Sequence, residues 1–243
     1  MLALGLIPAR YNSSRFPGKP LAMICGKPMV WWVYAQAKKS KKISEVYIAT
    51  DDERIEKACR EYEIPCIMTS SAHGTSTERL FEVSEKINAD VYVCINGDEP
   101  LINPDYIDAV IPDDIKEDVF VSNLMCEISD PVELIDSSNI KVVVDKFDNA
   151  LFFSRSPIPY PKASLEYSYF KHVGVLSYNK KALKLFNETS KGTNEKIEDI
   201  NELRFLEMGV KIKMIRVKKG DSLSVDTPKD LERVIDRISS ILA

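Results

Sequence analysis

"EVYIATDDERIEKACREYEIPCIMTS", residues 45–70, is the stretch of sequence that decides the fold. EVYIAT is a short, mostly apolar run and predicts a buried strand. The next segment predicts a helix with one apolar face, formed by Ile55, Ala58, Cys59 and Tyr62. PCIMTS predicts a second strand. Two strands joined by a helix favour a right-handed crossover between parallel neighbours.

The same alternation continues on both sides of this stretch. Apolar runs predict strands at 2–7 and 90–96, and helical patterns occupy 28–40 and 77–87. A chain that alternates strands and helices in this way places helices on both faces of one sheet. We therefore expect an α/β fold, a three-layer sandwich around a mostly parallel, Rossmann-like sheet.

The alternation loosens between residues 119 and 178, where strand-like segments follow one another. This part is predicted to be a β-rich insertion that extends the sheet edge or folds over it as a flap, and it is a candidate dimerisation surface. Regular elements are expected again as helices at 180–187 and 195–208, a strand at 211–217 and a helix that is capped by Thr227 and begins at Pro228. No linker or repeat is visible, so residues 1–243 are predicted to form a single domain.

Composition excludes several classes of protein. The chain has 44% hydrophobic and 29% charged residues and a net charge of −4, which is typical of a globular protein and argues against a general nucleic-acid coat. No apolar run approaches the ~20 residues that span a bilayer, and the first residues lack a basic leader. The five cysteines show no CxxC pair or zinc spacing. We expect a cytoplasmic protein without nucleic-acid or membrane partners.

The loop at 8–20, PARYNSSRFPGKP, follows the first predicted strand and is strongly basic. In an open parallel sheet, ligands bind outside the carboxyl ends of the strands. Arg10, Arg15 and Lys19 suit a triphosphate, and Gly18 lets the backbone approach it closely. The loop is not a Walker A motif, because GKP replaces GK[ST]. A solvated basic turn is the alternative interpretation.

Two acidic segments also lie at predicted strand ends. CINGDEPL, residues 94–101, presents Asp98 and Glu99, and LSVDTPKDL, residues 223–231, presents Asp226. Asp98 and Asp226 could meet across the sheet edge and hold Mg²⁺, which prefers a few carboxylates together with substrate phosphates. A simple turn at Asp98 and helix capping at Asp226 are the alternatives, although Thr227 can supply the cap.

HGTSTERL, residues 73–80, is a polar loop that opens a predicted helix. Its donors and acceptors suit the edge of a nucleotide base; they are Ser76, Thr77, Glu78 and Arg79. The same residues also match a capping box followed by a surface arginine. Both interpretations remain open from the residues alone.

Together these motifs form a specific combination. PARYNSSRFPGKPL, STERLFEV, NGDEP, FFSRSPIPY, KHVGVLSY and SVDTPKDLERV occur in this order between residue 6 and about residue 235. In this combination the chain resembles the CMP-3-deoxy-D-manno-octulosonate (CMP-Kdo) synthetases. The resemblance implies a nucleotidyltransferase fold and a homodimer. It also implies a Mg²⁺-dependent reaction in which CTP and a 3-deoxy-2-ulosonic acid give the CMP-sugar and pyrophosphate.

The resemblance also implies roles for individual residues. Those expected at the catalytic centre are Arg10, Arg15, Lys19 and Asp98. The nucleotide site would add Pro8, Ala9, Ser76, Arg79, Asn96 and Gly97. The sugar site would comprise Asn96, Arg155, His172, Glu198, Asn201 and Glu202, with Arg155 as the partner of the sugar carboxylate. Mg²⁺ would be held by Asp98 and Asp226.

The chain departs from the family pattern mainly on the sugar side. Asn96 replaces the usual Gln, Leu176 an expected Tyr, and Asn201 and Glu202 replace Glu and Gln; Ser76 replaces a glycine near the base. Either these changes are neutral and Kdo remains the substrate, or the acceptor is another carboxylated molecule such as 8-amino-Kdo. A site built to bind a hydroxyl discriminates sharply against analogues without it.

Two other classes of function remain as alternatives. A nucleotide-sugar glycosyltransferase usually has a D-x-D metal motif, whereas NGDEP supplies one aspartate in that frame. A non-catalytic nucleotide-binding module would bind CTP without turnover, but such a module needs no pair of metal carboxylates. We therefore predict a cytidylyltransferase.

Overall fold

The computed structural model describes residues 1–12, 16–164, 166–218 and 223–242. Its main sheet follows the order β11-β7-β10-β6-β1-β4-β5. The strands are β1 (Ala3–Ala9), β4 (Glu45–Thr50), β5 (Cys66–Met68), β6 (Val91–Ile95), β7 (Val121–Glu127), β10 (Phe170–Tyr178) and β11 (Lys213–Val217). Neighbours along this order pair in parallel except at β10, which is antiparallel to β6 and β7. The prediction of a mostly parallel sheet is confirmed.

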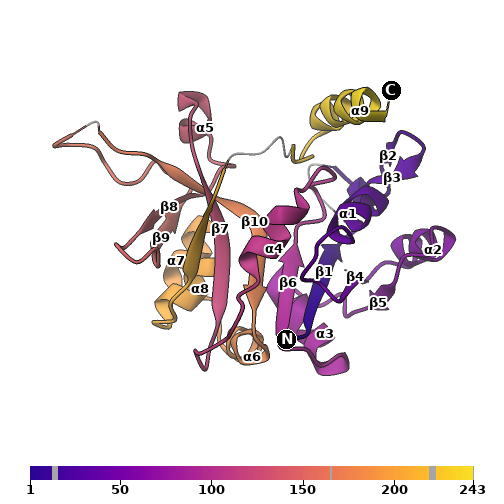
Figure 1. The fold of residues 1–243 in the computed structure, drawn as a ribbon, viewed down its shortest axis with the longest axis horizontal. Helices are drawn as coiled ribbons and strands as arrows, with labels where there is room; N and C mark the ends of the chain where they lie inside the picture. Colours follow the sequence, from indigo (N-terminus) through magenta and orange to yellow (C-terminus); the bar gives the residue numbers. More distant parts are fainter. Residues whose placement is uncertain (13–15, 165, 219–222, 243) are drawn as a thin grey trace.

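Helices cover both faces of the sheet (Figure 1). One apolar cluster packs against α1 (Met29–Ala37), α2 (Glu53–Glu61) and α4 (Pro104–Val110). A second packs against α3 (Ser76–Lys86), α6 (Lys180–Glu188) and α8 (Glu202–Glu207). Burial of both sheet faces explains why the central strands read as continuous apolar runs. The predicted three-layer sandwich is confirmed.

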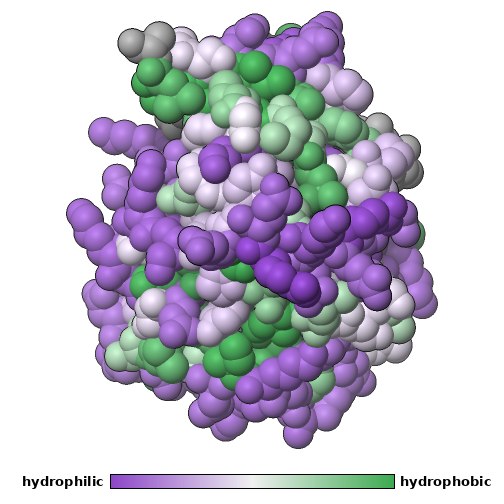
Figure 2. Space-filling view, turned by 90° about the vertical axis from the view of Figure 1, so that its right-hand side faces the viewer, coloured by the Kyte–Doolittle hydropathy of each residue, from purple (hydrophilic) through white to green (hydrophobic). Residues whose placement is uncertain are grey.

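Helix α2 shows how an amphipathic sequence packs as part of a helical layer against the sheet. Its buried side chains, Ile55 and Cys59, face the sheet, and its N-cap Asp52 accepts a hydrogen bond of 2.9 Å from the Arg54 amide. Most of its charged residues are exposed, and hydrophilic residues form a band across this side of the molecule (Figure 2). An amphipathic helix of this kind is stable because it packs.

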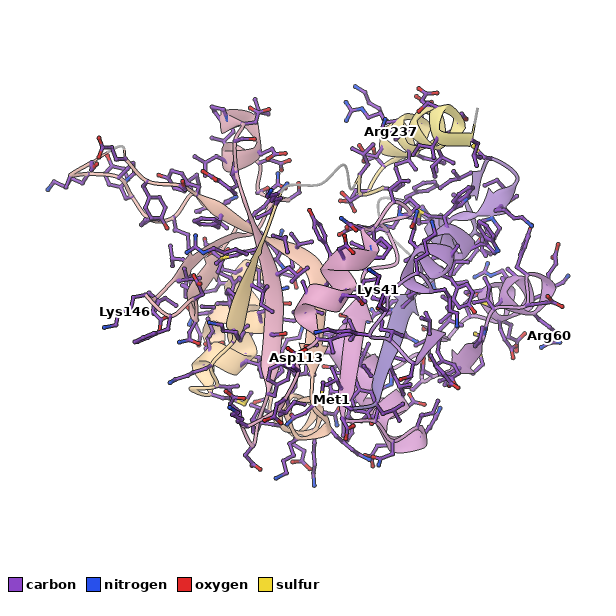
Figure 3. All side chains as sticks on the ribbon, in the orientation of Figure 1. Met1, Lys41, Arg60, Asp113, Lys146 and Arg237 are labelled. Carbon is purple, nitrogen blue, oxygen red and sulfur yellow. The ribbon has the colours of Figure 1, made fainter. Side chains whose placement is uncertain are left out.

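The segment 119–178 is not wholly an insertion, because β7 and β10 belong to the main sheet. The extension is formed by β8 (Lys141–Val144), β9 (Ala150–Ser154) and the short α5 (Pro131–Ile135). Figure 3 shows Lys146, in the turn between β8 and β9, at the opposite end of the long axis from Arg60 of α2. A role of this extension as a flap or dimer surface stays a prediction.

The helix predicted at 195–208 is divided into two. Helix α7 (Thr193–Glu198) ends at Asp199, whose φ of 52° is left-handed, and α8 begins at Glu202. Aspartate tolerates this conformation better than most residues, so the break was hidden in an otherwise helical pattern. Helix α9 (Pro228–Leu242) begins at Pro228 as predicted, and the side chains of Thr227 and Asp230 form its first-turn hydrogen bonds. Among the described residues, no helix is long and apolar enough to cross a membrane.

A buried ion pair joins α7 to α8. Arg204 donates hydrogen bonds of 2.7 Å from Nε and Nη2 to the two carboxylate oxygens of Glu195, and Nη1 donates to the carbonyls of Phe186 and Thr189. The two charged side chains are 3% and 1% exposed. A second ion pair of 3.7 Å connects Arg204 to Glu78 of α3.

Arg204→Met is expected to lower the free energy of unfolding by about 3–5 kcal/mol, because it leaves the Glu195 carboxylate buried without its partner. Urea unfolding measures the loss. The control is Lys184→Met, which removes an exposed pair with Glu188 and is expected to cost about 0.5 kcal/mol or less. Equal small losses in the two variants would contradict this description of the pair.

Candidate active site

The loop after β1 has a fixed path that places Lys19. Gly18 has a φ of 72°, and its amide donates a hydrogen bond of 2.8 Å to the carbonyl of Tyr11. A Cβ at this position would lie 3.2 Å from the Tyr11 ring, so glycine fits where a larger residue is strained. A 3-10 turn, η1 (Lys19–Leu21), follows directly. Arg15, expected in this loop, lies outside the described residues.

Lys19 brings the two predicted metal carboxylates together. Its Nζ lies 3.1 Å from Asp98 Oδ2 and 3.5 Å from Asp226 Oδ1, and it donates a hydrogen bond of 2.9 Å to the carbonyl of Val225. The Val225 amide in turn donates a hydrogen bond of 2.8 Å to the carbonyl of Asp98. The segment before α9 is therefore held against the carboxyl end of β6.

The chemistry of this cluster fits Mg²⁺. The side chains of Asp98 and Asp226 are 28% and 30% exposed, which leaves room for water and substrate around both. Within the described ranges, no group of three or more His, Cys, Asp and Glu residues gathers as a closed metal site. Two carboxylates with open positions suit Mg²⁺, which is usually held by one or two carboxylates plus substrate phosphates and water.

An open cavity of about 610 Å³ lies beside this cluster. It brings together predicted nucleotide residues from three parts of the chain: Pro8, Ala9, Arg10, Lys19, Ser76, Asn96 and Gly97. Gly97 permits the close approach of two of these parts, because a Cβ there would lie 2.9 Å from the Pro8 carbonyl oxygen. The basic loop therefore opens onto a cavity at the carboxyl ends of β1 and β6.

Arg79 does not line this cavity. Its side chain is fully buried, its Nη1 donates to the Thr69 hydroxyl, and its Nη2 lies 3.3 Å from Asp51 Oδ1. Burial lowers its pKa, with the Asp51 carboxylate opposing the effect. It is not a surface arginine either, so that part of the alternative interpretation is wrong. The expected capping box is present, between Thr75 and Glu78.

A second cavity of about 440 Å³ adjoins the first and shares Asn96, Asp98 and His172 with it. Its outer wall contains residues that sequence analysis missed. Lys171 Nζ donates a hydrogen bond of 3.2 Å to Asn139 Oδ1 and lies 3.5 Å from Glu133 Oε1. Lys171 adjoins His172 in β10, but Glu133 and Asn139 come from the extension, where no local motif marks them.

Arg155 and Glu198, predicted in the sugar site, line neither cavity. Arg155 donates hydrogen bonds to the carbonyls of Glu198, Asp199 and Ser137 at 2.7, 3.1 and 3.0 Å. The Glu198 carboxylate accepts from the Ser154 hydroxyl and the Arg155 amide. In this structure the two side chains hold the end of α7 and a neighbouring loop, and the roles of Arg155 and Glu198 in the sugar site stay predictions.

His172 and Glu202 do line the larger cavity, as do Asn201 and Leu176. Burial lowers the pKa of His172, while the nearby Glu202 carboxylate opposes the effect. Its Nδ1 is buried and has no hydrogen-bond partner among the described residues. The imidazole is therefore neutral near pH 7 and can bind a neutral polar group.

The lowered pKa of His172 predicts how the free energy of unfolding depends on pH. The unfolded chain protonates this residue near the usual pKa of about 6.5, whereas the folded chain does so only at lower pH, so stability falls as the pH decreases below that value. Between about pH 7 and about pH 5.5 the wild type should lose up to ~1 kcal/mol more than His172→Gln. Urea unfolding at both pH values measures the difference; equal losses would contradict the lowered pKa.

Comparisons with known proteins agree with this geometry. The family described as cytidylyltransferase matches residues 4–212. A 3-deoxy-manno-octulosonate cytidylyltransferase from Escherichia coli is 38% identical over 96% of this chain and 94% of the relative. An 8-amino-3,8-dideoxy-manno-octulosonate cytidylyltransferase from Shewanella baltica is 39% identical over 96% of this chain and 97% of the relative. A solved CMP:2-keto-3-deoxy-manno-octonic acid synthetase in complex with CTP is 38% identical, covers 99% of both chains and has a TM-score of 0.92.

Proposed function

The chain belongs to the cytidylyltransferase family that includes the CMP-Kdo synthetases, and from this premise we propose that it transfers CMP from CTP to the anomeric hydroxyl of a 3-deoxy-2-ulosonic acid, with release of pyrophosphate. The observation that supports this most directly is the contact of Lys19 with both Asp98 and Asp226 beside a cavity lined by the basic loop.

Lys19 and Arg10 are proposed to bind the triphosphate. Both line the larger cavity, and cationic donors make the strongest hydrogen bonds to phosphate oxygens. Arg15, in the same loop, is proposed to share this role. The backbone around Pro8, Ala9 and Gly97, with Ser76 at the start of α3, would enclose the nucleoside. The donors Asn96 and His172, common to both cavities, are positioned to orient the acceptor.

We propose that the enzyme depends on Mg²⁺ and that Asp98 and Asp226 hold the ion. When bound, it would neutralise phosphate charge at the reacting phosphorus. The protein performs little covalent chemistry in such a transfer, and its main contributions are orientation and fixed charge. Lys19 keeps Asp98 and Asp226 close together before the substrates arrive.

We also propose a cytoplasmic homodimer. Large apolar side chains are exposed on the extension and the loop after it: Val132, Ile135, Leu151 and Tyr160, with exposures of 67%, 73%, 60% and 85%. A second copy of the chain could cover some of them, because removing apolar surface from water stabilises an interface between subunits. Free cysteines, which include the buried Cys59, Cys94 and Cys126, suit a reducing compartment.

Pyrophosphate release tests the proposed function. The purified protein is incubated with Mg²⁺ and CTP, or with ATP, GTP or UTP as controls, and with a panel of 2-keto-3-deoxy acids that includes Kdo and 8-amino-Kdo. Release with CTP and at least one acid is expected, with the other nucleotides much poorer. CTP binding without turnover for any acid would contradict the proposal and favour a non-catalytic nucleotide-binding module.

A further inference from the structure

Glu202 is a nearly buried carboxylate that faces the larger cavity. It is the first residue of α8, its exposed fraction is 7%, and it lines the cavity together with His172, Leu176 and Tyr178. Across the described part of the chain, no hydrogen-bond donor or ion-pair partner contacts its side chain. Because Glu202 lines the cavity without a partner among the described residues, its carboxylate is available to bind a ligand there.

Three ionisable side chains close to Glu202 carry no positive charge near pH 7. Burial lowers the pKa of His172, so the imidazole is neutral near pH 7. Burial raises the pKa of Tyr178 and raises that of Cys94 to about 12, so the phenol and the thiol are also neutral. Lys191 lines the same cavity but is exposed, and no ion pair joins it to Glu202.

The cations that suit the triphosphate come from a different element than Glu202, although all three side chains line the same cavity. Arg10 and Lys19 follow β1, and Lys19 contacts Asp98 and Asp226. Glu202 comes from the α7–α8 segment, beside the acceptor-site residue His172. An anionic triphosphate would be repelled by this carboxylate, and the proximity of His172 leads us to assign Glu202 to the acceptor.

Sequence identity does not distinguish between the two acceptors. The relative named for 3-deoxy-manno-octulosonate is 38% identical to this chain, and the relative named for the 8-amino sugar is 39% identical. We propose that Glu202 selects an acceptor that carries a primary ammonium group in place of a hydroxyl, the class that includes 8-amino-3,8-dideoxy-manno-octulosonate. This inference rests on the proposed function, because it concerns the acceptor of that reaction. A hydroxyl could also donate to Glu202, but only a cation neutralises its charge.

The experiment measures kcat/KM for 8-amino-Kdo and for Kdo with the same protein. The wild type should prefer the amino acceptor by roughly 10- to 100-fold, the effect of one hydrogen bond between charged groups. The 8-acetamido derivative, which keeps the nitrogen but lacks the charge, should react no better than Kdo. Glu202→Gln should lower the preference for the amino acceptor by about 10-fold or more.

The matched control is Asp199→Asn. Asp199 lines the same cavity but its carboxylate is exposed, and asparagine also tolerates the left-handed backbone at this position. Water screens an exposed charge, so the acceptor preference should stay within about twofold of the wild type. A general loss of folding would lower both rates and leave their ratio unchanged, and CTP affinity reports whether the nucleotide site is intact.

The outcomes separate the two levels of the proposal. A wild type that uses Kdo as well as or better than the amino acceptor, or a Glu202→Gln variant with an unchanged ratio, would overturn the inference and leave the cytidylyl transfer standing. Pyrophosphate release with neither acceptor, despite CTP binding, would overturn the proposed function and the inference with it.

Discussion

Asp98→Asn is expected to lower kcat on the order of 10³-fold while CTP binding and the fold are retained. The substitution keeps the size of the side chain but removes the charge that faces Lys19 and, in our proposal, the bound metal ion. Steady-state pyrophosphate release over a Mg²⁺ titration measures the effect. If Asp98 holds the metal ion, the remaining activity of Asp98→Asn should reach its half-maximum at a much higher Mg²⁺ concentration than the activity of the wild type.

The matched control is Asp113→Asn, the same change at an exposed aspartate whose side chain is 95% exposed and pairs with Lys42. Asp113 pairs with Lys42, and the nearby Ser44 amide donates a hydrogen bond of 2.9 Å to the carbonyl of Ala3 at the start of β1, so Asp113 lies at the opposite end of this strand from the site; Figure 3 labels its position. This variant should retain wild-type kcat. Near-normal turnover in Asp98→Asn would show that the carboxylate has no part in the reaction.

Lys19→Met is expected to lower kcat by roughly 10²–10³-fold, the usual effect of removing one preorganised donor from a developing charge. The side chain loses its three contacts with Asp98, Asp226 and the Val225 carbonyl, so two carboxylates also face each other without a cation between them. The KM for CTP should rise as well, since the same ammonium is proposed to bind the triphosphate.

The control for this change is Lys41→Met, which removes an exposed ammonium near α4. Its kinetic constants should match those of the wild type. If Lys19→Met changes neither kcat nor the KM for CTP, the loop after β1 is a solvated basic turn, and the alternative interpretation of its sequence is correct.

Local patterns were sufficient for most of the fold. The run EVYIAT coincides with β4, because a strand that is largely buried on both faces is rich in apolar residues. The apolar face of α2 was visible at helical spacing. The antiparallel insertion of β10 between β6 and β7 was not predicted, because it depends on pairing between strands distant in sequence.

The site was predictable where each functional group lies in a motif at a strand end. Lys19, Asp98 and Asp226 come from three such segments, and the topology of the sheet brings them together. Glu133 could not be found in this way, because it reaches the smaller cavity through the path of the extension. Arg155 was assigned to the sugar site by resemblance. In the structure its guanidinium donates hydrogen bonds to three backbone carbonyls.

The most direct test of the central claim is the balance of products from CTP, Mg²⁺ and the preferred acid, followed by phosphorus NMR. Attack of the anomeric hydroxyl on the α-phosphorus predicts pyrophosphate and a CMP-sugar phosphodiester in equal amounts, with no cytidine diphosphate. Cytidine diphosphate as the product, or pyrophosphate without a CMP-sugar, would contradict the assignment of this chain as a cytidylyltransferase of ulosonic acids.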